Sequence, residues 1–290
     1  MLKISFPERI WIGGDKLEGI LYSAKDVIYG NSSVFFEVLP ESKILIDAAV
    51  IFLSLVNQLS VAGKTVTIDF HDEDSEVMGY FNRMGFFDHV DSRVAILPTR
   101  PSYSVAQLYS KSNKSIVEIV RIDQDDEELP GRLADALKTK DVKLGKAAFT
   151  IFGELIDNVL EHSSAKIDSY AALQTYKNGI MVIVSDSGKG LLATLRPKLP
   201  KKYKDASDIE IVIDAFEKGL SRHGRKSGRG CGLTTCAKKA KQFHGKLQVR
   251  LVDTRVNLVP SDDVYAHDTA YCYEQLLPIK GTHIAFDFSC

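Results

Sequence analysis

Residues 153–164 read GELIDNVLEHSS, and this stretch carries the strongest structural signal in the chain. Apolar residues recur through it at three- and four-residue intervals, which is typical of an amphipathic helix. The pattern predicts a long helix over residues 144–162. On such a helix Glu154 and Asn158 share one face, because residues four apart lie one above the other. A carboxylate and an amide at this spacing can form a site, although the same pair is also common on solvated helix surfaces.

A second stretch, residues 180–191, reads IMVIVSDSGKGL. Its first part is an apolar strand that ends at Asp186, and the KNG signal before it predicts a hairpin with residues 169–176. An ionised aspartate only accepts hydrogen bonds, so it can select the exocyclic amine that adenine has and guanine lacks at the same position. Gly188 and Gly190 let a backbone approach a ligand without a Cβ in the way, although a plain tight turn would use them too.

A third stretch, residues 228–236, reads GRGCGLTTC and leads into a helix that is predicted to begin near residue 232. Free backbone N–H groups at the start of a helix bind phosphate oxygens. Residues 196–229 contain ten Lys/Arg against five Asp/Glu, so the local potential favours a polyphosphate. A solvated basic loop has a similar composition. Nucleic-acid binding is disfavoured because only Tyr203 and Phe216 are available for base stacking.

In this order, and with Gly281-Thr282 near the end, these motifs resemble the nucleotide site of the GHKL ATPases. That superfamily includes gyrase-type topoisomerases, the ninety-kilodalton heat-shock chaperone, MutL-type repair proteins, histidine kinases and anti-sigma kinases. The resemblance implies that Glu154 is the catalytic base, that Asn158 holds Mg²⁺ and that Asp186 binds adenine. It implies ATP and Mg²⁺ as cofactors, and an amide oxygen is a ligand that suits Mg²⁺. It further implies a group of nucleotide-binding residues that shape the phosphate pocket, its lid and the adenine contact: Gly188, Gly190, Gly228, Gly230, Gly232, Leu233 and Thr282.

Two rival nucleotide-binding patterns fit less well. GKGLLA at residues 188–193, with Glu210 about twenty residues further on, partly matches a Rossmann fingerprint. Pro197 and Pro200 would interrupt the helix that this fold requires after the glycines. A Rossmann fold also gives no role to Glu154 and Asn158 on the helix over residues 144–162. The sequence contains no GxxxxGK[ST] pattern, so a P-loop has no support.

The first third of the chain has its own alternating pattern. Apolar periodicity predicts a strand over 34–39, a helix over 44–62 and a strand over 65–70, and within 75–87 a short helix followed by an apolar tail. This order, with its MGFF ending, resembles a STAS-like domain, the module of anti-sigma-factor antagonists. Two prolines in residues 97–104 suggest a boundary. We therefore expect an α/β (α+β) protein in which a STAS-like domain (1–100) precedes a C-terminal α/β sandwich, the GHKL-type ATP-binding domain (101–290).

The second half is expected to contain several further elements. They are a strand over 115–123, helices over 131–140 and 207–220, and strands within 244–253 and 282–288. His283 lies in the last of these strands, and we assign it no metal-binding role, because a lone histidine among apolar neighbours is more often structural.

Composition sets limits on partners and compartment. The formal net charge is −1, with a net of −5 over residues 1–100 and +4 over the rest, so no overall field recruits nucleic acid or a membrane. Four cysteines suit reduced thiols, and their spacing with the histidines gives no zinc pattern. No apolar run approaches the roughly 20 residues of a membrane span, and residues 1–14 show no signal peptide. We therefore expect a cytoplasmic protein.

Three activities are compatible with the resemblance. The first is a slow, Mg²⁺-dependent ATPase whose lid closes on ATP and gates interaction with the N-terminal domain or a partner protein. The second is an anti-sigma-type serine/threonine kinase. Ala48 and Ala49 stand where a phosphoacceptor serine would be wanted, so such a kinase would act on a separate partner. The third is a non-hydrolysing nucleotide sensor. A homodimer is compatible with all three.

Overall fold

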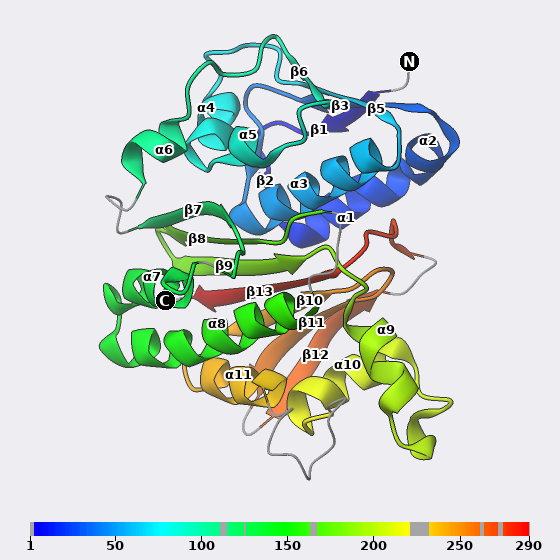
Figure 1. Cartoon of the computed structure of the whole chain (residues 1–290), viewed down its shortest axis with the longest axis vertical. Helices are drawn as coiled ribbons and strands as arrows, with labels where there is room; N and C mark the ends of the chain where they lie inside the picture. The colour runs from blue at the N-terminus through cyan, green and yellow to red at the C-terminus, as the bar shows by residue number, and fades with distance from the viewer. Residues whose placement is uncertain are drawn as a thin grey trace.

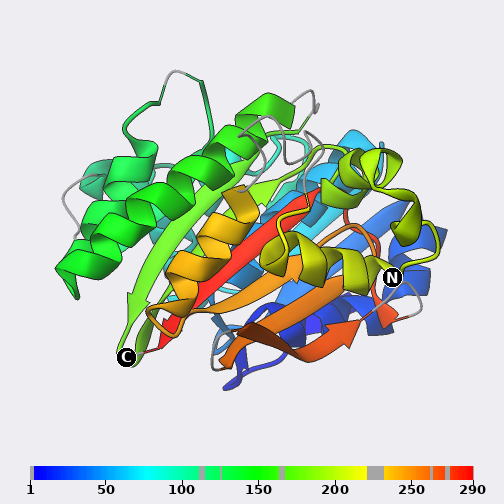
Figure 2. The ribbon, with the colours of Figure 1, turned by 90° about the horizontal axis from the view of Figure 1, so that it is seen from below.

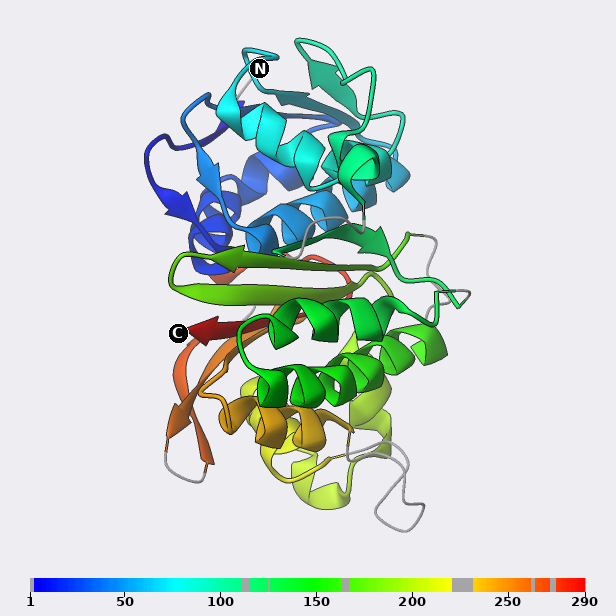
Figure 3. The same ribbon diagram turned by 90° about the vertical axis from the view of Figure 1, so that its left-hand side faces the viewer.

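The chain is represented by a computed structural model that describes residues 3–110, 115–124, 126–162, 167–220, 232–261, 264–271 and 275–289. Figures 1 and 3 show a small sheet, a layer of helices, a large sheet and a second layer of helices stacked on one another. The mixed α/β class that the sequence predicts is confirmed. Among the described residues, no helix is both long and apolar enough to cross a membrane.

The small sheet is parallel throughout. Its strands, in spatial order, are β1 (Lys3–Phe6), β3 (Ser33–Val38), β5 (Thr65–Asp69) and β6 (Ala95–Leu97). A separate two-stranded sheet pairs β2 (Trp11–Ile12) with β4 (Lys43–Ile44). The strands expected at 34–39 and 65–70 are confirmed as β3 and β5. In β1 and β3 buried residues alternate with more exposed ones, so one face of the sheet packs on the core.

Five short helices accompany this sheet. They are α1 (Gly14–Ser23), α2 (Lys25–Gly30), α4 (Glu76–Arg83), α5 (Phe86–His89) and α6 (Val105–Tyr109). The short helix expected within residues 75–87 corresponds to α4, and the apolar tail expected after it forms the short helix α5. Gly85 has φ +79° and lies between them, so the chain turns there because only glycine adopts this conformation readily.

The large sheet is antiparallel throughout. Its spatial order is β12 (Val264–Tyr271), β11 (Arg255–Ser261), β10 (Lys246–Arg250), β13 (Thr282–Ser289), β9 (Gly179–Asp186), β8 (Tyr170–Tyr176) and β7 (Ile116–Arg121). The predicted hairpin is confirmed, since Tyr176 pairs with Gly179 across a two-residue turn. A Rossmann site needs parallel strands, and β9 is antiparallel to both of its neighbours. Glu210 instead closes a capping box with Ser207.

One face of the large sheet is covered by helices from the same part of the chain. They are α7 (Leu129–Lys138), α8 (Val142–His162), α10 (Asp208–Glu217) and α11 (Gly232–Lys241). In Figure 2 α8 (green) and α11 (gold) lie over the strands. Ile151, Phe152 and Leu155 of α8 are buried against this face, as the predicted amphipathic pattern requires. The helices expected over 131–140, 144–162 and 207–220 correspond to α7, α8 and α10.

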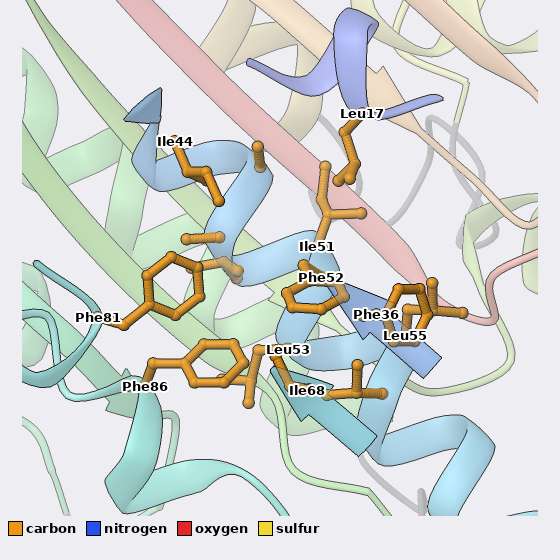
Figure 4. Close-up of a cluster of buried hydrophobic side chains, with 14 of the residues drawn as sticks. Leu17, Phe36, Ile44, Ile51, Phe52, Leu53, Leu55, Ile68, Phe81 and Phe86 are labelled. Carbon is orange, nitrogen blue, oxygen red and sulfur yellow. The ribbon is translucent and has the colours of Figure 1, made fainter. Parts of the chain in front are cut away.

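The opposite face of the large sheet is covered by α3 (Ile46–Val61), the helix expected over residues 44–62. Toward the small sheet, the Phe52 ring lies 5.0 Å from the rings of Phe6 and Phe36. It lies 5.9 Å from the ring of Phe86, and Figure 4 shows Phe36, Phe52 and Phe86 within this cluster. The same buried cluster continues into β9 through Ile183. Every residue of β9 is buried, which explains its uninterrupted apolar sequence: helices cover both faces of the strand.

Two buried arginines join the large sheet to α1. Arg250 Nε lies 2.9 Å from Glu18 Oε1, and the exposed fractions of the two side chains are 1% and 4%. Arg255, which is fully buried, lies 2.9 Å from Asp15 Oδ1. A Cβ on Gly14 would fall 2.5 Å from the Arg255 guanidinium, so the close approach of α1 depends on this glycine. Buried charges are tolerated when they are paired and hydrogen-bonded.

The buried pair of Arg250 and Glu18 predicts that removing its carboxylate costs more stability than removing the carboxylate of an exposed ion pair. Glu18→Ala leaves the Arg250 charge buried without its partner, so we expect the free energy of unfolding to fall by roughly 3–5 kcal/mol. The control is Glu41→Ala, which removes an exposed pair with Arg9 and should leave stability nearly unchanged. Urea unfolding of the two variants checks this expectation, and equal losses would contradict it.

Candidate functional site

The first motif lies on the sheet-facing helix α8. Asn158 is half-buried, and its side-chain Nδ2 donates to the Glu154 carbonyl oxygen at 2.7 Å. Glu154 is exposed, whereas Leu155 and Val159 beside it are buried against the sheet. With its amide nitrogen engaged by the helix, Asn158 has its amide oxygen as the atom suited to a cation.

The second motif lies at the end of β9. Asp186 is only 7% exposed, and its Oδ1 accepts hydrogen bonds from Gly188 N at 2.8 Å and from Ser169 Oγ at 3.4 Å. Asp186 pairs directly with Thr282, the first residue of β13. The antiparallel register therefore brings together two motifs that are far apart in the sequence.

Glycines make this junction possible. Gly190 has φ +82°, and the next residue, Leu191, donates its backbone N–H to Thr282 Oγ1 at 2.8 Å. Gly281 has φ +108°, and a Cβ at this position would fall 1.7 Å from the Asp186 carbonyl oxygen. The loops after β9 and before β13 are thus in direct backbone contact, which only glycine permits.

The third motif meets the first. A Cβ on Gly232, the first residue of α11, would lie 2.5 Å from Glu154 Oε2 and 3.8 Å from Asn158 Nδ2. Glu154 is therefore close to the start of α11 without a side chain between them. Gly228 and Gly230 lie outside the described residues.

A cavity of about 500 Å³ opens between these motifs. Five of the predicted residues line it: Asn158, Asp186, Gly190, Leu233 and Thr282. The other predicted residues, Glu154, Gly188 and Gly232, are not part of the lining. The volume lies within the range that small-molecule sites occupy in proteins.

The sequence analysis missed much of the remaining lining. It consists of Gln124, Leu155, Val159, Leu160, Glu161, Val184, Lys189, Leu191, Thr194 and Ile284. Lys189 is the most informative of these, because it is an exposed cation between the two glycines of the second motif. Its position between two glycines, in DSGKG, was a usable signal that Lys189 would line the cavity. The apolar residues of the lining lie close in sequence to the predicted polar residues, mostly on the same helix or strand.

The residues present fit a magnesium ion that is held mainly by a bound nucleotide. Among the described residues, no three His, Cys, Asp or Glu side chains gather as a metal cluster. Mg²⁺ usually keeps several waters and takes one or two protein ligands plus phosphate oxygens. Asn158 in the cavity wall would provide such a ligand, and the Cβ-free space at Gly232 would leave room for phosphates beside it.

Comparison with protein families agrees with this geometry. Residues 145–282 match the family described as histidine kinase-, DNA gyrase B- and HSP90-like ATPase. The matched region begins in α8, ends at Thr282 and contains every motif residue named above. It supports placing this part of the chain in the GHKL superfamily, and it supports ATP binding by an ATPase or kinase of that type. A search of curated proteins found no match to the chain.

A buried polar pair lies directly behind Asp186 and Thr282. Ser185 Oγ is 2.7 Å from His283 Nδ1, and the two residues are cross-strand neighbours in β9 and β13. Burial, together with the positive charges of Arg250 and Arg255, lowers the pKa of His283 to about 3. His283 is therefore neutral near pH 7, which suits a structural role.

The Gly281 contact predicts a large loss of stability on adding one methyl group. Gly281→Ala places a Cβ against the Asp186 carbonyl at a positive φ, so the free energy of unfolding should fall by about 3 kcal/mol or more. Gly19→Ala is the control: it lies in α1 with nothing within 4 Å, and should gain up to about 1 kcal/mol. Urea unfolding measures both, and a stable Gly281→Ala protein would contradict the packing.

The lowered pKa of His283 predicts acid sensitivity. His283 takes up a proton near pH 6.5 in the unfolded chain but not in the folded chain. The free energy of unfolding is therefore highest above pH 6.5, and it decreases as the pH falls toward 3. Between pH 7.5 and 5 the loss is about 2 kcal/mol. His283→Asn should flatten this part of the pH profile of urea unfolding. An unchanged profile would mean that another group carries it.

Proposed function

We propose that this protein is a Mg²⁺-dependent ATP-binding protein and a slow ATPase. Closure of its lid on ATP gates interaction with the N-terminal domain or with a partner protein. The observation that carries the proposal is the cavity of about 500 Å³ in which Asn158, Asp186 and Thr282 meet, inside the region that matches the ATPase family. That match supports ATP binding; hydrolysis and gating belong to the proposal.

Each residue has a defined task in this proposal. Asp186 accepts a hydrogen bond from the adenine amine, and its contact with Gly188 N keeps the carboxylate oriented. Thr282 reaches the base from the adjacent strand. Asn158 holds the metal, which neutralises phosphate charge when it is bound. Glu154, exposed beside the start of α11, takes the proton of the attacking water. Lys189 adds a positive charge at the cavity wall.

A serine/threonine kinase acting on a separate protein is the second candidate. Transfer to the chain's own N-terminal part at Ala48 and Ala49 is disfavoured, because both positions lack a hydroxyl and are buried in the first turns of α3. Glu154 would serve equally as base for a substrate hydroxyl. A nucleotide sensor that does not hydrolyse ATP is the third candidate.

We also propose the division into a STAS-like domain over residues 1–100 and an ATP-binding domain over 101–290. The parallel order β1-β3-β5-β6 in the first part, against the antiparallel sheet in the second, supports it. We expect that the surface formed when the lid closes on ATP binds a protein partner or a second copy of the chain.

ATP labelled at the γ-phosphate separates the candidates. Free phosphate and labelled protein are followed together for the wild type, Glu154→Ala, Asp186→Asn and Asn158→Ala. We expect slow phosphate release that falls about 100-fold in Glu154→Ala while ATP binding persists, because a general base contributes roughly 10²–10⁴ to the rate. Asp186→Asn and Asn158→Ala should weaken ATP binding about tenfold or more.

The matched control is Asp157→Ala, which removes an exposed carboxylate from the same helix and should leave turnover unchanged. Undiminished phosphate release by Glu154→Ala would remove the base assignment. Tight binding without phosphate release would favour a sensor or a kinase that awaits its substrate.

A further inference from the structure

Helix α3 lies on the face of the large sheet opposite α8, where it contacts residues close in sequence to Asp186 and Thr282 of the cavity wall, and these contacts extend the proposed function. Ser54 and Gln58 lie four residues apart on α3 and therefore on one face of the helix. Ser54 bonds to Ser185 of β9, which is next to the cavity residue Asp186. Gln58 bonds to Lys280 in the loop before β13, two residues from the cavity residue Thr282. Neither Ser54 nor Gln58 belongs to the matched ATPase region.

Gln58 holds the loop before β13. Its Oε1 accepts from Lys280 N at 2.8 Å, and its Nε2 donates to Lys280 O at 3.0 Å. The side-chain amide thus satisfies both backbone groups of Lys280, as a neighbouring strand would. Gly281 and Thr282 follow directly, so the position of the Thr282 hydroxyl depends on this attachment.

Ser54 holds the end of β9. Its Oγ lies 3.0 Å from Ser185 Oγ, which in turn contacts His283. Ser54 is fully buried, and Ser185 is the residue before Asp186. The chain of three polar groups runs from α3 across both strands whose ends carry the proposed adenine contacts. Buried polar groups of this kind fix a local geometry because an unpaired member is costly.

A third polar residue of α3 reinforces the same end of the sheet. Asn57 Nδ2 donates to Tyr170 Oη at 3.2 Å, and Asp91 N donates to Asn57 Oδ1 at 2.8 Å. Tyr170 follows Ser169, whose hydroxyl bonds to Asp186. The segments that flank the proposed adenine contacts are therefore each attached to α3.

We propose that α3 is a positioning element of the nucleotide site and that Gln58 and Ser54 set the affinity for the adenine end of the ligand. The inference rests on the proposed ATP binding. Coupling between two equilibria is reciprocal. If the packing of α3 on the large sheet strengthens nucleotide binding by some factor, nucleotide binding therefore stabilises that packing by the same factor. A protein that shifts α3 would change ATP affinity without touching the cavity.

Two matched variants test the proposal. Gln58→Met removes both bonds to Lys280 and keeps the length of the side chain. Tyr80→Phe removes a bond of 2.7 Å to Gln174 in the same interface, near the other end of β8 and away from the cavity. We expect Gln58→Met to raise the Kd for ATP and for ADP by the same factor, about tenfold, because the base is common to both. It should raise KM more than it lowers kcat. Tyr80→Phe should stay within about twofold.

Amide hydrogen exchange of the nucleotide-free protein supplies a readout that needs no ligand. Gln58→Met should speed exchange in residues 281–283 and 186–190, and Tyr80→Phe should not. Unchanged exchange, or faster exchange with an unchanged Kd, would overturn the proposal. A wild type that binds no ATP would instead overturn the proposed function and the claim about affinity, and exchange alone would then decide whether α3 holds these loops.

Discussion

A helix with apolar side chains on every side must be covered on every side, and α3 imposes this requirement on the molecule. The small parallel sheet covers one side through Phe36 and Phe6, and the large sheet covers the other through Ile183 and Ala172. Neither sheet alone could exclude water from α3. The first hundred residues and the sheet of the ATPase-like region therefore share one continuous core.

The buried charges follow from the same arrangement. Once α1 and α3 cover the large sheet, Arg250 and Arg255 on its strands lose contact with water and need acidic partners. Glu18 and Asp15 of α1 supply them. These pairs offset the cost of burying the guanidinium groups, and they fix α1 in one register against the sheet. Part of the net negative charge of the first hundred residues, and part of the positive charge of the remainder, lies at this contact.

Much of the local structure could be predicted, and the reason lies in periodicity. The helices α3, α7, α8 and α10 and the hairpin β8–β9 each carry a pattern that is complete within the element. The hairpin β11–β12 and strands β1 and β6 were missed, and the apolar tail expected after the short helix within residues 75–87 is itself a helix, α5, which follows the turn at Gly85. In the site, Asp186 and Thr282 were predicted from motif order. The apolar wall and Lys189 were not, because their role depends on which strands become neighbours.

The contact between α3 and the segments that carry the cavity residues Asp186 and Thr282 was also missed, although the sequence contains a sign of it. Asp47, Ser54, Asn57 and Gln58 are four of the five polar residues in a helix that is otherwise apolar, and a buried polar side chain is costly unless a partner lies opposite to bond with it. In the structure each has a partner: Gly14 for Asp47, Ser185 for Ser54, Tyr170 for Asn57 and Lys280 for Gln58. Three of these four partners lie in the large sheet or in the loop that enters it. Polar residues within an apolar helix therefore mark the side on which that helix meets polar residues of another layer, and here that layer contains the proposed nucleotide site.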